Sequence, residues 1–221
     1  MKKSYASHGQ DLILRWLMEN TTQGNFLDIG AYHPIVDSNS YLFYEHGWRG
    51  IAIEPNSNLQ EEWSSLRPRD IFINKAFALE ELVTYYVHPT LPTLNSTSAM
   101  PIYSIGFECS SEEIEVRQIA GISGAEVAAI CSFYDFLSLD VEGHEEIILH
   151  NLLNSGVRFD LAIIECNKLN MISDLNTNSI IRLCERFELR PIAKLPHDLI
   201  FVKMGGKYSK RFPRKMLSHI S

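Results

Sequence analysis

The stretch N-F-L-D-I-G-A-Y-H-P, residues 25–34, has the pattern of a buried strand that ends in a tight turn. Phe26, Leu27 and Ile29 favour a strand, and Gly30 follows it directly. In a doubly wound α/β sheet, ligands bind beyond the carboxyl ends of the strands. A second apolar strand, 50–53, ends on Glu54, close to the separation of about 20 residues at which a carboxylate binds a ribose. The stretch therefore predicts a nucleoside site.

The rest of the chain alternates between predicted strands and helices, which implies a mostly parallel sheet covered by helices. Strands of this sheet are predicted at 25–30, 48–54, 71–77, 133–140, 159–165, 189–195 and 198–204. Helices are predicted at 8–20, 38–47, 56–66, 125–130, 143–153 and 177–187. The last two strands are joined by a short turn, so they are predicted to be antiparallel. Another strand, 82–87, follows 71–77 so closely that the two are predicted to pair as a hairpin.

The chain has 221 residues, of which 45% are hydrophobic and 21% are charged, as is typical of a single globular domain. Residues 88–125 are rich in Pro, Ser, Thr and Gly, and we predict that they form a lid over the substrate. Within them, 112–119 alternates like a strand. Residues 205–221 form a basic tail, which we expect to be a solvated end or a contact for an anionic partner.

Charge and cysteine usage narrow the choice of partners and compartment. The net charge is −7, so the acidic body of the protein argues against binding a long nucleic acid. The four cysteines include no C-x-x-C pair, which predicts reduced thiols in a cytoplasmic protein. No apolar run approaches the roughly 18 residues of a transmembrane segment. The sequence does not indicate the oligomeric state.

The turn after residues 25–29 distinguishes between nucleotide-like cofactors. A dinucleotide fingerprint needs three glycines, whereas Ala31, Tyr32 and His33 follow Gly30 here. No G-K-[ST] sequence occurs, so a Walker phosphate loop is absent. S-adenosylmethionine keeps an adenosine but lacks phosphates, and its positive charges suit an acidic crevice. The residues therefore favour a methyltransferase.

Several segments resemble the FkbM family of S-adenosylmethionine-dependent methyltransferases. They are G-Q-D (9–11), F-L-D-I-G-A-Y-H-P (26–34), S-N-S-Y (38–41), F-Y-E-H-G-W-R-G-I-A-I-E-P-N (43–56), D-F-L-S-L-D-V-E-G-H-E (135–145) and I-I-E (163–165). The resemblance implies the Rossmann-like, seven-strand methyltransferase sheet with its last strand antiparallel. It also implies O-methylation of hydroxyls, often on sugars or other secondary metabolites.

Cofactor-binding residues are predicted along the first turn and at the other strand ends. They are Gln10, Asp28, Gly30, Ala31, Tyr32, Ser38, Asn39, Glu54, Pro55, Asn74, Lys75, Ala76 and Asp140. Glu54 is expected to accept hydrogen bonds from both ribose hydroxyls, and residues 74–76 are expected to lie at the adenine edge. Gln10 either contacts the methionine end or faces solvent. Ser38 and Asn39 either contact the cofactor or cap a helix.

The catalytic candidates are Asp140, Glu142 and His144. Asp140 ends the predicted strand 133–140, beside the expected position of the methyl group. Methyl transfer to a hydroxyl requires a nucleophile that is aligned with the methyl and relieved of its proton. His144 is the natural general base, because an unperturbed histidine has a pKa near ~6.5. Alternatively, His144 is a histidine on the helix surface with no catalytic role.

A metal site competes with direct substrate binding at the same strand ends. Asp140, Glu165 and Asn167 resemble the acid/acid/Asn oxygen site by which catechol-type O-methyltransferases hold Mg²⁺. Oxygen ligands suit Mg²⁺, which would orient substrate oxygens and lower the pKa of a hydroxyl. Alternatively, Glu142 and Glu165 bind sugar hydroxyls directly.

The sequence thus predicts an S-adenosylmethionine-dependent O-methyltransferase, with or without Mg²⁺, that acts on a hydroxyl of a sugar or glycan. One alternative is a nicotinamide-dependent, sugar-modifying oxidoreductase, which would require the missing glycines. The other is a non-catalytic binding protein on a degenerate methyltransferase fold, against which the intact D-V-E-G-H-E block argues.

Overall fold

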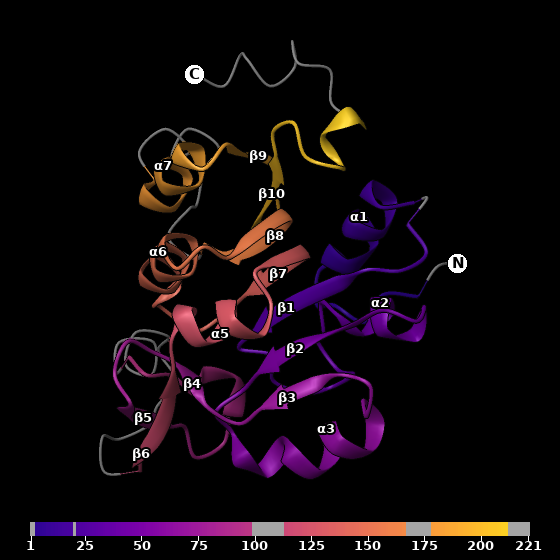
Figure 1. Ribbon diagram of the computed structural model, residues 1–221. Coiled ribbons are helices and arrows are strands. Elements are labelled where there is room, and N and C mark those ends of the chain that lie inside the picture. Colours follow the sequence, from indigo (N-terminus) through magenta and orange to yellow (C-terminus); the bar gives the residue numbers. More distant parts are fainter. Residues whose placement is uncertain (1–2, 20, 99–112, 167–177, 212–221) are drawn as a thin grey trace.

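A seven-stranded sheet with helices on both faces forms the body of the computed structural model, which describes residues 3–19, 21–98, 113–166 and 178–211 (Figure 1). Its strands are β1 (Asn25–Ile29), β2 (Arg49–Ile53), β3 (Ile71–Ile73), β7 (Phe133–Leu139), β8 (Arg158–Glu165), β9 (Leu189–Lys194) and β10 (Asp198–Lys203). The strand order is β3-β2-β1-β7-β8-β10-β9. β10 runs antiparallel to both of its neighbours, and the other pairs are parallel, as predicted.

The helices cover the two faces of this sheet because successive residues of each strand point to opposite sides. They are α1 (Gln10–Leu17), α2 (Tyr41–Glu45), α3 (Gln60–Leu66), α5 (Gly124–Ile130), α6 (Glu145–Asn154) and α7 (Ser179–Arg186), with short 3₁₀ turns η1 (Ser57–Leu59), η2 (Pro92–Leu94) and η4 (Ser209–Arg211). In β1, Leu27 and Ile29 join the core beneath α5, α6 and α7, whereas Phe26 joins the core beneath α1 and α2. Both cores are fully buried, so the sheet is a rigid support for whatever lies at its carboxyl edge.

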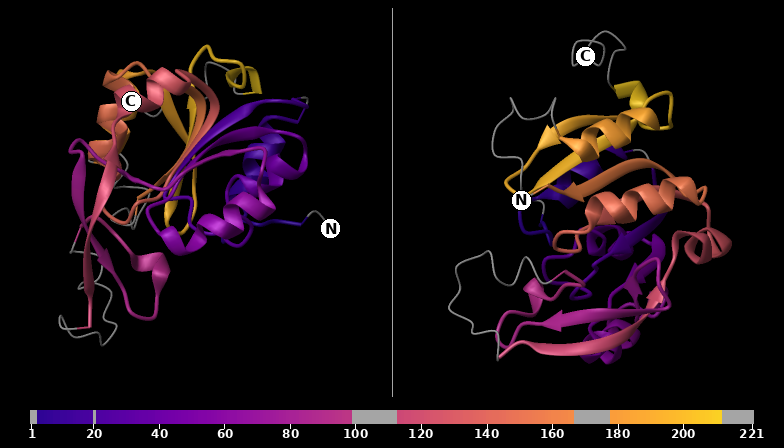
Figure 2. Two further views of the ribbon diagram at one scale, coloured as in Figure 1. Left: turned by 60° about the horizontal axis from the view of Figure 1, so that its bottom comes forward. Right: turned by 90° about the vertical axis from the view of Figure 1, so that its left-hand side faces the viewer.

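A second, three-stranded sheet is inserted between β3 and α5. It consists of β4 (Ala76–Phe77), β5 (Leu82–Val87) and β6 (Glu115–Ile122) in the order β4-β6-β5. Figure 2 shows it as an arm that projects beside the main sheet. The predicted strand 112–119 therefore exists but begins three residues later, at Glu115.

Two expectations about this insertion are wrong. The predicted strand 71–77 is interrupted where the Lys75 N–H bonds to the Ile73 carbonyl (2.9 Å), so β4 leaves the main sheet. The predicted hairpin between 71–77 and 82–87 does not form, because β5 pairs antiparallel with β6, which also pairs with β4. A short connection allows a hairpin, but a longer and better matched partner strand lies downstream. Local spacing alone cannot reveal it.

The predicted helix 38–47 begins at Tyr41, and the Ser38 hydroxyl accepts a hydrogen bond from the Tyr41 N–H (3.1 Å). The start of the basic tail is docked on the domain, since Lys207 pairs with Asp135 (2.9 Å). The tail beyond Arg211 lies outside the described residues. Among the helices that the structure describes, none has the length and apolar character to cross a membrane.

Candidate active site

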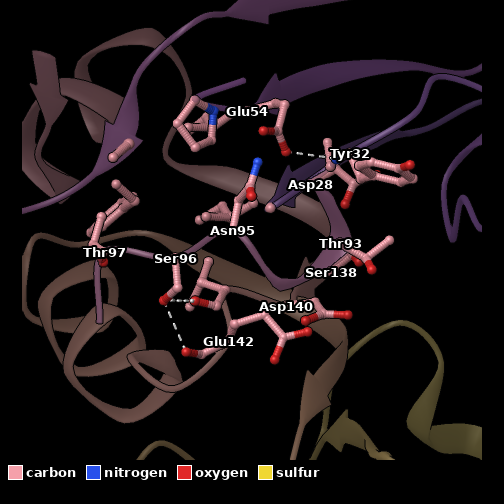
Figure 3. A pocket seen from close by; sticks show the side chains of 18 of the residues that line it. Asp28, Tyr32, Glu54, Thr93, Asn95, Ser96, Thr97, Ser138, Asp140 and Glu142 are labelled. Carbon is pink, nitrogen blue, oxygen red and sulfur yellow. Dashed lines mark hydrogen bonds between the residues drawn. The ribbon is translucent and has the colours of Figure 1, made fainter. Parts of the chain in front are cut away.

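A cavity of about 220 Å³ opens at the carboxyl ends of β1, β2 and β7, and we call it the strand-end cavity (Figure 3). Its floor is formed by residues 28–32, 53–55, 138 and 140–142. Residues of β4, β5 and the segment 92–97 form the facing wall. The predicted ligand crevice is therefore present, and the inserted sheet closes one side of it.

Gly30 forms the closest contact in the floor of the cavity. Its φ is +75°, a conformation that side chains disfavour, and a Cβ at this position would lie 1.6 Å from the Asp140 carbonyl oxygen. The Gly30 N–H also bonds to the Ile53 carbonyl (3.0 Å), and the Asp140 N–H bonds to Ile29 (3.0 Å). A glycine is therefore required for β1, β2 and β7 to meet at this point.

Glu54 is a buried carboxylate held by two backbone donors. Its Oε2 accepts from the Tyr32 N–H (2.8 Å) and its Oε1 from the Asn56 N–H (2.7 Å). Burial raises the pKa of Glu54 to about 7, although the two N–H groups oppose the shift. Each oxygen keeps a further lone pair, so the carboxylate can accept two more hydrogen bonds from a ligand in the cavity.

Asp28 is fixed by a buried polar network beneath the same floor. Its Oδ2 accepts a hydrogen bond from the Ser40 hydroxyl (2.5 Å), and Ser40 in turn accepts one from Arg67 Nη1 (2.9 Å). Arg67 is fully buried, pairs with Asp70 (2.6 Å) and stacks on Trp63. Burial raises the pKa of the Asp28 carboxyl, while Ser40 and Arg67 oppose the shift. The network therefore ties the end of β1 to Arg67, the residue that follows α3.

Acidic side chains meet at the side of the cavity opposite Glu54 (Figure 3). Asp140 is accessible from the cavity but closely surrounded by protein. Desolvation by this protein raises the pKa of Asp140 strongly, and repulsion from Glu142 raises it further. Burial likewise raises the pKa of Glu142 to about 7 and that of Glu165 to about 11. Carboxylate oxygens of Asp140, Glu145 and Glu165 lie within 4.8 Å of one another. Such a cluster is stable when it shares protons or holds a cation.

Most of the predicted site residues line the strand-end cavity. They are Asp28, Gly30, Ala31, Tyr32, Asn39, Glu54, Pro55, Ala76, Asp140 and Glu142. Tyr32 and Glu142 have positive φ values of 45° and 57°, which place two non-glycine residues in a strained conformation at the cavity. Strain that is retained in this way is common at functional sites.

Other predicted residues point elsewhere. Gln10 is buried and donates to Asp198 (2.7 Å), and Ser38 lies in the network around Arg67. Asn74 donates to the Glu54 backbone carbonyl (2.9 Å), while Lys75 lies 3.8 Å from Glu126. None of these four contributes to the described lining of the cavity, and their predicted role in binding a cofactor stays a prediction. Asn167 lies outside the described residues.

His144 lines a second cavity, of about 430 Å³, between α6 and the inserted sheet. Its Nδ1 is 2.7 Å from the Thr97 hydroxyl, and Thr97 lines both cavities. The structure thus brings Asp140 and Glu142 together and places the His144 ring on the other side of Thr97. The role of His144 as a base stays a prediction.

Sequence reasoning missed the wall of the strand-end cavity. Phe77 and Tyr85 contribute from the inserted sheet, Ser138 from β7, and Thr93 and Asn95 from the segment after β5. The richness of residues 88–125 in small polar side chains was a signal for the segment as a whole. It did not indicate which of its residues would reach the cavity, because that depends on the pairing of β5 with β6.

Residues 28–182 match the family described as the methyltransferase FkbM domain. The chain belongs to this family. The matched range includes the floor of the strand-end cavity and the acidic cluster, and a methyltransferase domain of this kind implies S-adenosylmethionine as the methyl donor. The seven-stranded sheet, in which β10 runs antiparallel to β8 and β9, is consistent with a Rossmann-like methyltransferase fold.

Solved structures of two methyltransferases are similar to this FkbM domain. One is 1,6-didemethyltoxoflavin-N1-methyltransferase from Burkholderia thailandensis, with 11% identity, a TM-score of 0.43, and coverage of 87% of this chain and 74% of that chain. The other is the methyltransferase domain of METTL16, with 13% identity, a TM-score of 0.40, and coverage of 86% and 66%. No curated protein matches the chain.

Proposed function

We propose that this FkbM domain transfers a methyl group from S-adenosylmethionine to a hydroxyl of a sugar or glycan in the cytoplasm. The observation that carries the proposal is the Glu54 carboxylate, which is held by two backbone N–H groups and still faces the strand-end cavity. A buried acid at the end of β2 has the right chemistry to accept both hydroxyls of a ribose.

The residues of the cavity fit an adenosine-containing sulfonium. The absence of a Cβ at Gly30 leaves room where β1 and β7 meet, and Glu54 supplies the ribose acceptor. Ala76 and Phe77 offer an apolar wall for a base, while Asp140 and Glu142 place carboxyl groups at the far side, which a bound cation would help to ionise. When bound, S-adenosylmethionine supplies a methyl group activated by the positive sulfonium. The negative end of the cavity favours that charge.

The acceptor side is supported by small polar groups. Thr93, Asn95 and Thr97 line the cavity from the segment after β5 and can bind a polyhydroxylated molecule. Glu142 is the proposed general base, because it lines the cavity and its pKa is about 7, which matches a base that works near neutral pH. We propose a small molecule or glycan rather than a nucleic acid as the acceptor, since the net charge is −7.

The acceptor is tested by incubating the protein with tritium-labelled S-adenosylmethionine and a panel of free sugars, oligosaccharides, amines and short RNA. We expect label on a saccharide, in a methyl ether that withstands the mild base that hydrolyses methyl esters. Label on an amine or on RNA, with none on any saccharide, would remove the O-methylation proposal while leaving methyl transfer in place.

Replacing Glu54 is expected to weaken cofactor binding strongly. In the wild type, the Glu54 carboxylate accepts hydrogen bonds from two backbone N–H groups. In Glu54→Gln, the amide NH₂ must face one of these N–H groups. A donor opposed to a donor in a buried site costs about 1–3 kcal/mol, so the Kd for S-adenosylhomocysteine is expected to rise by a factor of about 5–150. Titration calorimetry measures this. An exposed matched change, Glu61→Gln, is expected to leave the Kd unaltered, and equal Kd values for the two variants would contradict the ribose role.

The raised pKa of Glu54 predicts a pH dependence of stability. The folded protein holds the Glu54 proton up to about pH 7, whereas the unfolded chain releases it near the ordinary value of 4.5. The stability associated with this proton is present below pH 4.5 and is lost as the pH rises to about 7, a change of about 3 kcal/mol. Urea unfolding at pH 5 and pH 8 is expected to show a smaller loss in Glu54→Gln than in the wild type. Equal losses would show that burial does not shift this group.

Mg²⁺ at the acidic cluster is a separate proposal, supported by an all-oxygen set of Asp140, Glu145 and Glu165. It predicts that EDTA removes methyl transfer, that Mg²⁺ restores it, and that Mg²⁺ raises the Tm of the wild type but not of Asp140→Asn. Transfer and Tm that are both indifferent to EDTA would eliminate the metal and leave protons as the means of stabilising the cluster.

A further inference from the structure

The loop between β7 and α6, residues 140–144, donates backbone hydrogen bonds to the Glu145 side chain. The Oε1 atom of Glu145 accepts from the N–H groups of Val141 (3.1 Å) and Gly143 (2.9 Å). Glu145 is buried, although it belongs to the first turn of α6. One carboxylate oxygen therefore determines the path of the backbone on both sides of Glu142.

Backbone carbonyls of the same loop accept hydrogen bonds from the Ser96 hydroxyl. This hydroxyl lies 3.0 Å from the Glu142 carbonyl oxygen and 3.3 Å from that of Val141, and it accepts from the Ser98 N–H (2.9 Å). Ser96 is itself anchored, because its backbone exchanges two hydrogen bonds with Tyr86 of β5 (2.8 and 3.1 Å). The segment after β5 thus reaches the backbone on either side of Glu142 through the buried Ser96 hydroxyl (Figure 3).

These bonds surround a residue that would not adopt its conformation unaided. Glu142 has a φ of 57°, and a left-handed conformation costs a residue with a side chain about 1–2 kcal/mol. Such a conformation persists only where neighbouring structure imposes it. In it, the Glu142 side chain lines the strand-end cavity beside Asp140.

We propose that Ser96 and Glu145 are positioning residues, which hold Glu142 in the left-handed conformation and so keep its carboxylate in the strand-end cavity. The proposal rests on the proposed function, because it takes the charge of Glu142 to act on a sulfonium bound there. It assigns the segment after β5 a role in arranging the reacting groups, in addition to forming a wall. It also gives Glu145 a role through the oxygen that accepts the two hydrogen bonds from the loop, separate from the proposed metal site, so the affinities are measured without Mg²⁺.

The test compares the affinities of S-adenosylmethionine, which carries the sulfonium charge, and S-adenosylhomocysteine, which does not. The ratio of the two affinities, measured by calorimetry on the full chain, reports the negative charge at the sulfonium position and needs no acceptor. Glu142→Gln is expected to lower the ratio about fivefold, and Ser96→Ala and Glu145→Ala about threefold, as loss or displacement of one partly screened charge implies. Ser64→Ala, which removes an exposed serine hydroxyl in α3, is the matched control.

Conservative variants separate positioning from other roles. Ser96→Thr keeps the donor and Glu145→Gln keeps the oxygen acceptor, so both are expected to retain the wild-type ratio within about twofold. The double variant Ser96→Ala/Glu142→Gln is expected to match Glu142→Gln alone, because a residue that acts through another adds nothing once that residue is removed.

The outcomes distinguish this inference from the proposed function. A wild type that binds neither ligand overturns the proposed function. A wild type that binds both, with an unchanged ratio in Ser96→Ala and Glu145→Ala, overturns only the positioning role. Equal losses in Glu145→Gln and Glu145→Ala would show that the charge of Glu145 acts directly, and additive losses in the double variant would show that Ser96 acts independently of Glu142. Either result contradicts the proposal.

Discussion

Gly30→Ala is expected to lose about 3 kcal/mol of unfolding free energy and to bind S-adenosylhomocysteine too weakly for calorimetry. Two costs combine at this position. A side chain at φ +75° costs about 1–2 kcal/mol, and the new Cβ would overlap the Asp140 carbonyl oxygen, from which it would be separated by only 1.6 Å. The floor of the strand-end cavity must then shift, and Asp140 and Glu54 shift with it. Urea unfolding and calorimetry measure the two effects.

Gly47→Ala is the matched control for this prediction. Gly47 has a φ of +89°, but a Cβ there would meet no atom within 4 Å. It therefore carries the conformational cost alone, about 1–2 kcal/mol, and should leave the Kd unchanged. If the two variants lose equal stability and both retain binding, then the close approach of β1 and β7 at Gly30 is not required for cofactor binding.

Glu142→Gln is expected to lower methyl transfer by a factor of about 10²–10⁴, while S-adenosylhomocysteine still binds. The factor is that of a general base in the transition state, since the amide cannot take a proton, and it exceeds the roughly fivefold effect expected from loss of the Glu142 charge. Because burial raises the pKa of Glu142 to about 7, the wild-type rate is expected to increase as the pH rises through 7. The measurement is the initial rate with the saccharide that accepts label, between pH 5.5 and 8.5.

His144→Gln is the comparison that decides between the two candidate bases. The His144 ring lines the second cavity and contacts Thr97, so its replacement is expected to leave the rate within about threefold of the wild type. A large loss in His144→Gln together with a mild one in Glu142→Gln would reverse the assignment. The proton would then leave through His144, as the sequence had suggested.

The main sheet could be predicted because its signals are local. Each strand of the sheet is a short apolar run bounded by a turn, and the acids Glu54 and Asp140 follow such runs directly. Parallel strands bring their carboxyl ends to one edge, so these two acids had to face one crevice once the order of strands was right. The antiparallel pair at the end of the chain followed from the short turn before Asp198.

The inserted sheet and the second cavity could not be predicted, because they depend on pairing between distant segments. β5 finds its partner in β6, beyond the segment 88–114, and this pairing brings Ser96 onto the loop after β7. Asn74 and Lys75 are predicted at the adenine edge because they follow β3; the chain turns there, so that Asn74 donates to the Glu54 backbone carbonyl and Lys75 lies 3.8 Å from Glu126. The turn that follows a strand determines where the next side chains point, and the sequence after β3 does not indicate the type of turn.

Titration calorimetry of the wild-type chain with S-adenosylhomocysteine and with NADH tests the central claim most directly. The geometry of Gly30 and Glu54 predicts one-to-one binding of S-adenosylhomocysteine and none of NADH, because Ala31 and Tyr32 stand where a pyrophosphate site would need glycines. Binding of NADH alone would favour an oxidoreductase. Binding of neither ligand would contradict the account and leave a methyltransferase fold without its cofactor.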